Sequence, residues 1–234
     1  MLINKIIAVE GLDKTGKSTF CNAFESVYST MGGINTQVLK KHSFPNATSP
    51  IGVVIRNELS GANPSTDIVN TPNFLSEMSH YWSVELFNNA KEVITPPTNS
   101  QIIPDQNTNE LNYLFDRYFI STIAYQAFFN NSKVDLEFIK TSLNINKFLK
   151  MPTDLIFLDL PNEEIIRRTL IDQEAGLNDG NDTLDEAILD KRREAYQNSI
   201  KFLKGMGINV HYFEDSSVKS MEDLSKILIG KIFT

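Results

Sequence analysis

Short, nearly continuous apolar runs alternate with longer segments in which apolar residues recur every three or four positions. The five apolar runs are residues 5–10 (KIIAVE), 36–40 (TQVLK), 111–116 (LNYLFD), 154–160 (DLIFLDL) and 209–213 (NVHYF). Such runs are typical of strands buried on both faces of a parallel sheet. The helical spacing predicts helices over residues 17–30, 51–59, 73–94, 119–129, 136–150, 163–171, 185–203 and 221–232. The alternation predicts an α/β fold, a five-stranded parallel sheet with helices on both faces.

Three irregular segments interrupt this alternation. Residues 61–72 and 96–110 are rich in Pro, Asn, Ser and Thr, which predicts surface loops. Residues 172–182 (DQEAGLNDGND) contain two glycines and predict a mobile flap, although an ordinary exposed loop has the same composition. Neither of the first two is long enough to be an interdomain linker. We therefore expect residues 1–234 to form a single domain.

Composition narrows the class of protein further. Among the 234 residues, 22 Lys and Arg stand against 29 Asp and Glu, so the formal net charge is −7. Non-specific nucleic-acid or anionic-membrane binding needs a basic face, so we expect neither partner. The one cysteine, Cys21, excludes an internal disulfide framework and favours a cytoplasmic location. No apolar stretch reaches the roughly 18 residues of a membrane span, and the N-terminal run lacks a signal-peptide cleavage site.

Residues 11–18 (GLDKTGKS) match the phosphate-loop pattern G-x-x-x-x-G-K-[ST]. They follow the first predicted strand and open the first predicted helix. Gly11 and Gly16 permit backbone angles that turn successive amides toward an anion at the helix N-terminus. Lys17 is expected to bridge the terminal phosphates, and the Ser18 hydroxyl is expected to ligate Mg²⁺. The sequence thus predicts a site for ATP and Mg²⁺, with a glycine-rich turn as the structural alternative.

Three segments together resemble the thymidylate kinase family of P-loop nucleoside monophosphate kinases. IAVEGLDKTGKST (7–19) is similar to the family's first loop, EG-x-D/E-x-x-GK-S/T. FDRYFISTIAYQ (115–126) is similar to its DRY-x-x-S-x-x-AYQ segment, and PTDLIFLDLPNEEIIRR (152–168) to its fourth strand and the start of its lid. With Phe44-Pro45 and residues 51–56, the resemblance spans most of the chain. It implies a P-loop kinase fold, a lid at about residues 169–185, and phosphoryl transfer from ATP-Mg to dTMP for dTTP synthesis.

Several candidate site residues follow the ends of predicted strands, where open α/β sheets bind their ligands. The planar fork of Arg117 suits a monophosphate, although a surface salt bridge with Asp116 is the alternative. Asp116 is expected to orient the acceptor or a magnesium-bound water, and Asp13 to bind the sugar 3′-hydroxyl. The resemblance places Phe44 near the substrate nucleotide, where it is equally suited to packing in a turn.

Ser121, Thr122, Tyr125 and Gln126 are spaced to share a helical turn or its neighbour. The resemblance implies that Thr122 and Gln126 contact the pyrimidine base, while Tyr125 crowds the ribose 2′ position. A partly buried polar helix start, with Ser121 as its cap, is the alternative.

The sequence departs from the family pattern in the base pocket. Arg56 matches a family arginine that reaches the substrate, but no arginine occurs between Arg56 and Arg117. The resemblance places Tyr81 where thymidylate kinases usually read a thymine carbonyl with arginine. We expect Tyr81 or the adjacent His80 to donate a hydrogen bond to the base, or the enzyme to accept a broader set of deoxynucleotides.

The lid is unusual in its charge. Residues 169–190 contain no Lys or Arg, whereas the phosphate loop contains Lys14. We expect Lys14 to stabilise the transferring phosphoryl group and Arg167, with Arg168, to add charge at the lid hinge. The complete expected ATP site comprises Gly11, Asp13, Lys14, Thr15, Gly16, Lys17, Ser18, Thr19 and Arg167.

Together with the phosphate-loop motif, the resemblance implies a dTMP kinase, and we expect its catalytic residues to be Lys17, Lys14, Asp13, Asp116 and Arg117. A deoxynucleoside kinase or a broader deoxynucleoside monophosphate kinase on the same fold is the first alternative. A nucleotide-binding regulatory protein without catalysis is the remote one. The resemblance also implies a homodimer.

Overall fold

The computed structural model describes residues 3–31, 37–46, 48–50, 52–53, 110–127, 133–145, 151–177, 182–214 and 220–233. The predicted helix over residues 73–94 and most of the one over 51–59 lie outside these residues. Arg56, His80 and Tyr81 lie outside them as well. No helix that the structure describes is long and apolar enough to cross a membrane.

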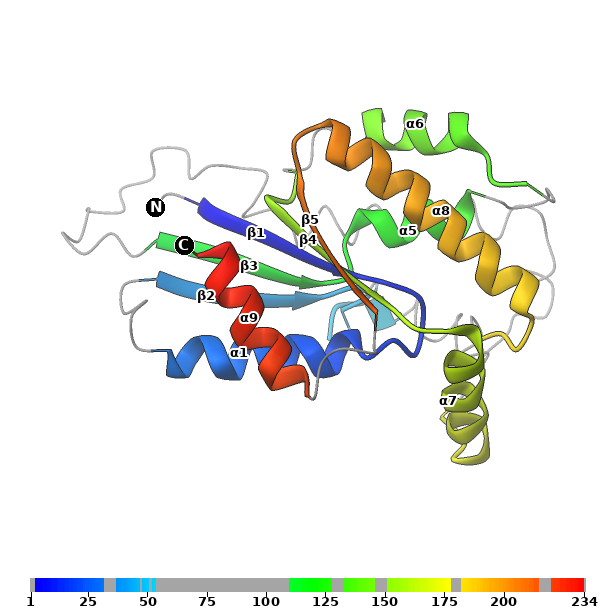
Figure 1. Ribbon diagram of the computed structural model, residues 1–234, viewed down its shortest axis with the longest axis horizontal. Helices are drawn as coiled ribbons and strands as arrows, with labels where there is room; N and C mark the ends of the chain where they lie inside the picture. Colours follow the sequence, from blue (N-terminus) through cyan, green and yellow to red (C-terminus); the bar gives the residue numbers. More distant parts are fainter. Residues whose placement is uncertain are drawn as a thin grey trace.

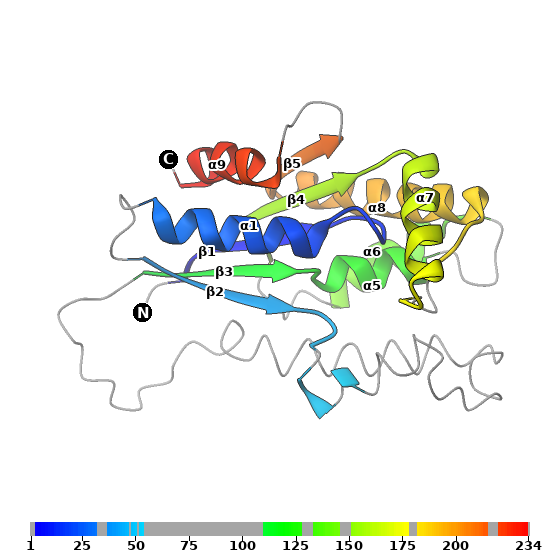
Figure 2. The same ribbon diagram turned by 90° about the horizontal axis from the view of Figure 1, so that it is seen from below.

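Five parallel strands form one sheet in the order β2-β3-β1-β4-β5 (Figures 1 and 2). The strands are β1 (Ile3–Glu10), β2 (Gln37–Ser43), β3 (Glu110–Asp116), β4 (Asp154–Asp159) and β5 (Asn209–Glu214). All six residues of β4 are buried, whereas β5 at the sheet edge is partly exposed, which follows from their different apolar content. The predicted five-stranded parallel sheet is confirmed.

The helices cover both faces of the sheet. Helices α1 (Lys17–Thr30) and α9 (Met221–Ile232) pack on one face (Figure 1). Helices α5 (Phe119–Gln126) and α8 (Glu186–Gly205) lie on the other face, and α6 (Leu136–Ile145) packs against these two helices on their outer side. Helix α7 (Asn162–Glu174) extends beyond the carboxyl ends of the strands, beside the start of α1 (Figure 2).

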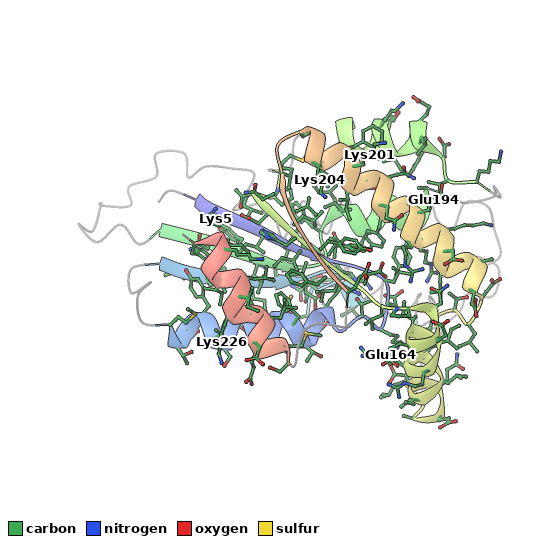
Figure 3. The ribbon with its side chains drawn as sticks, in the orientation of Figure 1. Lys5, Glu164, Glu194, Lys201, Lys204 and Lys226 are labelled. Atoms are coloured by element: carbon green, nitrogen blue, oxygen red, sulfur yellow. The ribbon has the colours of Figure 1, made fainter. Side chains whose placement is uncertain are left out.

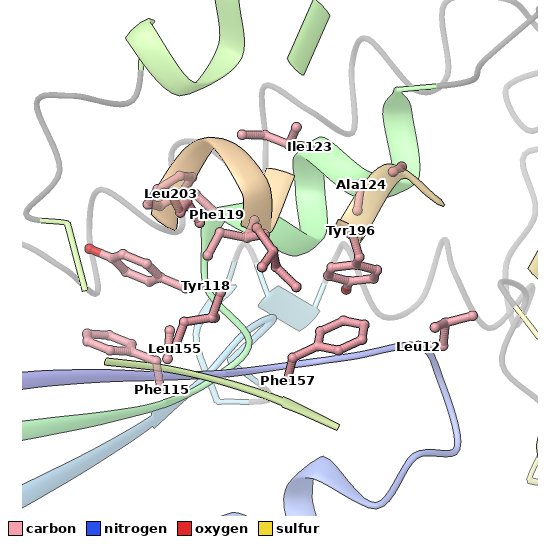
Figure 4. Packing of buried hydrophobic residues seen from close by; sticks show 14 of the residues in the cluster. Leu12, Phe115, Tyr118, Phe119, Ile123, Ala124, Leu155, Phe157, Tyr196 and Leu203 are labelled. Atoms are coloured by element: carbon pink, nitrogen blue, oxygen red, sulfur yellow. The ribbon is translucent and has the colours of Figure 1, made fainter. Parts of the chain in front are cut away.

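Each face of the sheet has its own apolar core. Under α1 and α9, Phe20 and Phe24 pack with aliphatic residues of β1 and β4. On the other face, Phe157 of β4 lies 5.2 Å from Tyr196 of α8 between ring centroids, and Phe115 lies 4.7 Å from Tyr118 (Figure 4). Each buried side chain of this size contributes roughly 1.5–3 kcal/mol relative to exposure. The second core fixes α5 and α8 against the end of the sheet where the predicted site residues lie.

Helix α7 is longer than predicted, so residues 172–174 of the predicted flap are helical. The helix ends at Glu174 with Ala175 as its C-cap, and the following Gly176 has a φ of 71°, in the left-handed region. The Leu177 N–H donates to the Asp172 carbonyl and the Gly176 N–H to that of Gln173, which is the Schellman arrangement. The glycine that suggested a pivot therefore terminates the helix.

Candidate active site

The phosphate loop runs from the end of β1 to the start of α1. Gly11 has a φ of 148°, and a Cβ atom there would lie 2.2 Å from the Leu158 carbonyl oxygen, so only glycine fits. Gly16, with a φ of 85°, is the N-cap of α1 and supplies no side-chain cap. The backbone N–H groups in the first turn of α1 therefore receive no hydrogen-bond acceptor from the cap side chain. Such N–H groups at a helix N-terminus are available to bind an anion.

Lys17 is buried beneath this loop. Its Nζ donates to the Leu12 carbonyl and lies 3.4 Å from Thr15 Oγ1. Burial lowers the pKa of Lys17 to about 8, and the charge of Arg117 acts in the same direction. Phosphate oxygens would favour the charged form of this amine, so ligand binding and protonation of Lys17 are coupled.

Arg117 connects β3 to the phosphate loop. Its φ of 69° is left-handed, and its N–H donates to the Val9 carbonyl at 2.9 Å. The guanidinium donates to Asp13, and its Nη1 lies 3.5 Å from both the Gly11 carbonyl and Ser121 Oγ. The structure thus pairs Arg117 with Asp13 of the loop rather than with neighbouring Asp116.

Asp13 collects several donors. Tyr125 donates its hydroxyl hydrogen to Asp13 Oδ2 at 2.5 Å, and Arg192 Nη1 of α8 lies 3.7 Å from the same oxygen. Burial alone would raise the pKa of Asp13, but the charges of Arg117, Lys17 and Arg192 outweigh it and hold the pKa at about 2. Asp13 is consequently a permanent acceptor at the centre of the predicted acceptor site.

Asp116 turns toward the other side of the loop. Ser18 donates its hydroxyl hydrogen to Asp116 Oδ2 at 2.5 Å, and the Phe44 N–H donates to the Asp116 carbonyl at 3.0 Å. A hydroxyl and a carboxylate are the hard oxygen donors that Mg²⁺ prefers, so this pair fits the predicted metal role. Phe44 is buried, with its ring centroid 5.8 Å from that of Phe115, which is the packing role left open above.

Helix α5 contributes further predicted site residues. Thr122 Oγ1 is buried and has no hydrogen-bond partner among the described residues. Ser121 does not cap α5, whose N-cap is Tyr118, but donates its hydroxyl to Glu10. Gln126 ends α5, and its side chain lies outside the described residues.

Glu10, directly before the phosphate loop, has a role that the sequence motif did not indicate. It is the last residue of β1 and is fully buried. Its Oε1 accepts from the N–H groups of Tyr118 at 2.8 Å and Ser121 at 3.3 Å. Glu10 of β1 therefore caps the N-terminus of α5, the helix that follows β3. Burial raises the pKa of Glu10 to about 7 against the lowering effects of Ser121 and Arg117.

Helix α8 contributes two residues that no motif indicated. Arg192 and Tyr196 lie one turn apart, which places them on the same face of the helix. The Arg192 guanidinium carbon lies 4.5 Å from the centre of the Tyr125 ring. The Tyr196 hydroxyl oxygen lies 3.2 Å from both the Gly11 carbonyl oxygen and Ser121 Oγ, within hydrogen-bond distance of each. The sequence signal was helical spacing alone, because Arg192 lies three residues after Leu189 and Tyr196 four residues before Ile200 on the buried face.

Lys14, at the tip of the phosphate loop, contacts the segment that the sequence predicts to be a lid. Lys14 Nζ donates to Asp172 Oδ2 at 2.6 Å and lies 2.9 Å from Asp182 Oδ2, while Arg168 donates to the Lys14 carbonyl at 3.0 Å. Burial would lower the pKa of Lys14, but the two carboxylates raise it. The lysine therefore links the loop to both Asp172 and Asp182, the first and last residues of the predicted flap.

The structure does not bring Arg167 to the loop. Arg167 is exposed and pairs with Glu164, which lies on α7 (Figure 3). Its neighbour Arg168 also pairs with Glu164, at 2.6 Å, and reaches the loop as described above. The lid-hinge arginine that contacts the phosphate loop is thus Arg168.

Comparison with known proteins agrees with this geometry. The family model described as thymidylate kinase matches residues 9–211. A thymidylate kinase of Aliarcobacter butzleri is 28% identical over 223 residues, covering 95% of each chain. A probable thymidylate kinase of Methanococcus aeolicus is 25% identical over 231 residues, covering 98% of this chain and 96% of the relative.

Solved structures share the fold. The thymidylate kinase of Candida albicans superposes with a TM-score of 0.62 at 19% identity, over 99% of this chain and 92% of that one. That of Ehrlichia chaffeensis gives 0.54 at 16% identity, over 98% of both. These likenesses confirm the P-loop kinase fold. Because the family model covers most of the residues that form the loop, the sheet and the site, the chain belongs to the thymidylate kinase family.

Proposed function

We propose that this protein transfers the γ-phosphoryl group of ATP to dTMP, giving ADP and dTDP for dTTP synthesis. The observation that carries the proposal is the contact of Arg117 with Asp13, which joins the phosphate loop to the segment that resembles the acceptor site. A donor site and an acceptor site thereby share one buried cluster, as direct phosphoryl transfer requires.

ATP would be bound by the loop and the start of α1. The residues assigned to it are Gly11, Asp13, Lys14, Thr15, Gly16, Lys17, Ser18 and Thr19, with Arg168 in place of Arg167. Ser18 and Asp116 would hold Mg²⁺, and their hydroxyl–carboxylate contact of 2.5 Å supports this assignment. When bound, the ion neutralises charge on the β- and γ-phosphates.

dTMP would lie against β3 and α5. Arg117 binds its phosphate, Asp13 its sugar hydroxyl, and Thr122 and Gln126 its base, while Tyr125 excludes a 2′-hydroxyl. The Thr122 hydroxyl has no hydrogen-bond partner in the described part of the chain, which supports a polar contact with the base. Phe44, Ser121, Arg56 and Tyr81 complete the proposed acceptor site, the last two on the strength of the resemblance.

Catalysis would depend on position and charge rather than on covalent intermediates. Lys17, Lys14 and Arg117 surround the transferring group, and lid closure excludes water that would otherwise accept it.

We further propose a cytoplasmic homodimer without nucleic-acid or membrane partners. The buried thiol of Cys21 and the net charge of −7 support this environment.

The function is tested by measuring ADP release with ATP-Mg and each of dTMP, dUMP, dCMP, dGMP, dAMP, UMP and thymidine. Turnover confined to dTMP, with dUMP weaker, is the expected result. Activity with thymidine alone would identify a nucleoside kinase, and activity spread over several monophosphates would identify a broader kinase. ATP binding without turnover on any acceptor would instead favour a regulatory protein.

A further inference from the structure

Helix α8 brings a second guanidinium group to the predicted acceptor site. Arg192 is 91% buried, and its Nη1 lies 3.7 Å from Asp13 Oδ2. Arg117 reaches the other oxygen of the same carboxylate, Oδ1. Two arginines from different elements, β3–α5 and α8, therefore meet at one carboxylate.

The guanidinium groups of both arginines lie close to the aromatic ring of Tyr125. The Arg192 guanidinium carbon lies 4.5 Å from the ring centre, and that of Arg117 lies 5.7 Å from it. Contact with an aromatic face restricts a guanidinium group and leaves its edge available for oxygen acceptors. Because Tyr125 also donates to Asp13 at 2.5 Å, the ring, the carboxylate and both arginines form one network of contacts.

Three cationic side chains gather around Asp13 in this buried cluster. Lys17, Arg117 and Arg192 all act on Asp13, and Asp116, which accepts from Ser18, also acts on Lys17. Glu10 cannot supply a full compensating charge near neutral pH, because burial raises its pKa to about 7. An anion placed at this cluster would therefore meet three nearby cations, two of which are guanidinium groups suited to phosphate oxygens.

We propose that Arg192 contacts substrate and, together with Arg117, binds the phosphate of the acceptor nucleoside monophosphate. A phosphate presents three terminal oxygens and can accept hydrogen bonds from two guanidinium groups at once. Both guanidinium groups already reach the single carboxylate of Asp13, so they are close enough together to bind one phosphate. The assignment rests on the proposed function and deepens it. Arg192 would thereby help the enzyme to select a monophosphate over a nucleoside.

The test compares two ligands that differ only in the phosphate. Binding of dTMP and of thymidine, each without ATP, is measured by calorimetry on wild type, Arg192→Met, Arg192→Lys and the control Lys191→Met. Lys191 is the adjacent cation of α8 and has no ion pair among the described residues, so it reports the effect of net charge alone. Circular dichroism and thermal unfolding confirm that each variant is folded, and Arg192→Gln replaces Arg192→Met if the latter does not fold.

We expect Arg192→Met to weaken dTMP binding at least tenfold and thymidine binding less than twofold. Arg192→Lys should recover part of the loss, and Lys191→Met should change the affinity for neither ligand.

An equal loss of affinity for both ligands would mean that Arg192 only positions Asp13 and Tyr125. An unchanged dTMP affinity would likewise overturn the proposal. If wild type itself binds dTMP no better than thymidine, the proposed function is wrong and the role of Arg192 with it. If wild type prefers dTMP and Arg192→Met keeps that preference, only the role of Arg192 is wrong.

Discussion

Ser18 Oγ and Asp116 Oδ2 lie 2.5 Å apart although 98 positions separate them in the sequence. The contact exists because β1 and β3 are adjacent and parallel, with Val9 paired to Asp116, so that both strands end at the same edge of the sheet. The helix that follows β1 therefore begins beside the carboxylate that ends β3. Two oxygen donors from separate motifs form one candidate metal site.

Asp116→Asn should reduce kcat by about 10²-fold and raise the Mg²⁺ concentration needed for half-maximal rate. The amide keeps the size and one carbonyl oxygen but loses the charge that favours a divalent cation. Turnover measured over a Mg²⁺ titration checks this. Glu194→Gln, an exposed change on α8 (Figure 3), is the matched control and should behave as wild type. An unchanged Mg²⁺ requirement in Asp116→Asn would remove Asp116 from the metal site.

Lys14→Ala should lower kcat at least tenfold, because the lid segment supplies no Lys or Arg of its own to stabilise the transferring phosphoryl group. The lysine is held between Asp172 and Asp182, which also keep it protonated. Single-turnover rates with saturating ATP and dTMP measure the effect. Lys140→Ala, which removes an exposed lysine on α6, is the control. A kcat within about threefold of wild type would exclude a transition-state role for Lys14.

Glu10 should make wild-type stability depend on pH. Its pKa rises from 4.5 to about 7 on folding, so its contribution is fully present below pH 4.5 and is lost as the pH rises through about 7. The unfolded state ionises first, which lowers the free energy of unfolding over this window by on the order of 3 kcal/mol. Glu10→Gln has no proton to lose at this site.

Urea denaturation of wild type and Glu10→Gln at about pH 5 and about pH 8 tests the assignment. The wild type should lose stability relative to Glu10→Gln between these pH values. Parallel behaviour of the two proteins would show that Glu10 is ionised in the folded state with an ordinary pKa. Glu137→Gln, an exposed change on α6, should reproduce the wild-type profile.

The sheet and the phosphate loop could be predicted because both depend on local pattern. The apolar runs marked all five strands, and α1 and α9 begin and end at the predicted residues. Strand β2 was predicted too short, ending at residue 40 instead of Ser43. Its last residues are polar, yet their backbone pairs with β3, and the His42 ring stacks on Phe115 at 5.4 Å. Such pairing depends on the neighbouring strand and leaves no mark in the hydrophobic pattern.

The contributions of Glu10, Arg192 and Tyr196 could not be predicted, for a related reason. Arg192 and Tyr196 occupy positions that the helical period assigns to the buried face, where a sequence pattern cannot separate a site residue from a core residue. Glu10 belongs to a recognised motif, but its capping of α5 requires β1 and β3 to be neighbours. Tertiary placement, rather than motif, assigns these roles.

Thr122→Val should separate substrate recognition from stability. The Thr122 hydroxyl is buried without a hydrogen-bond partner among the described residues, and an unpaired buried hydroxyl costs about 1–3 kcal/mol. Valine keeps the shape and removes that cost, so the free energy of unfolding should stay the same or rise. If Thr122 contacts the base, the same change should raise the KM for dTMP about tenfold, since the base loses a polar partner. Thr122→Ser, which keeps the hydroxyl, is the matched control and should retain most of the dTMP affinity. Loss of stability in Thr122→Val with an unchanged KM would show that Thr122 is a structural residue of α5 and not part of the base site.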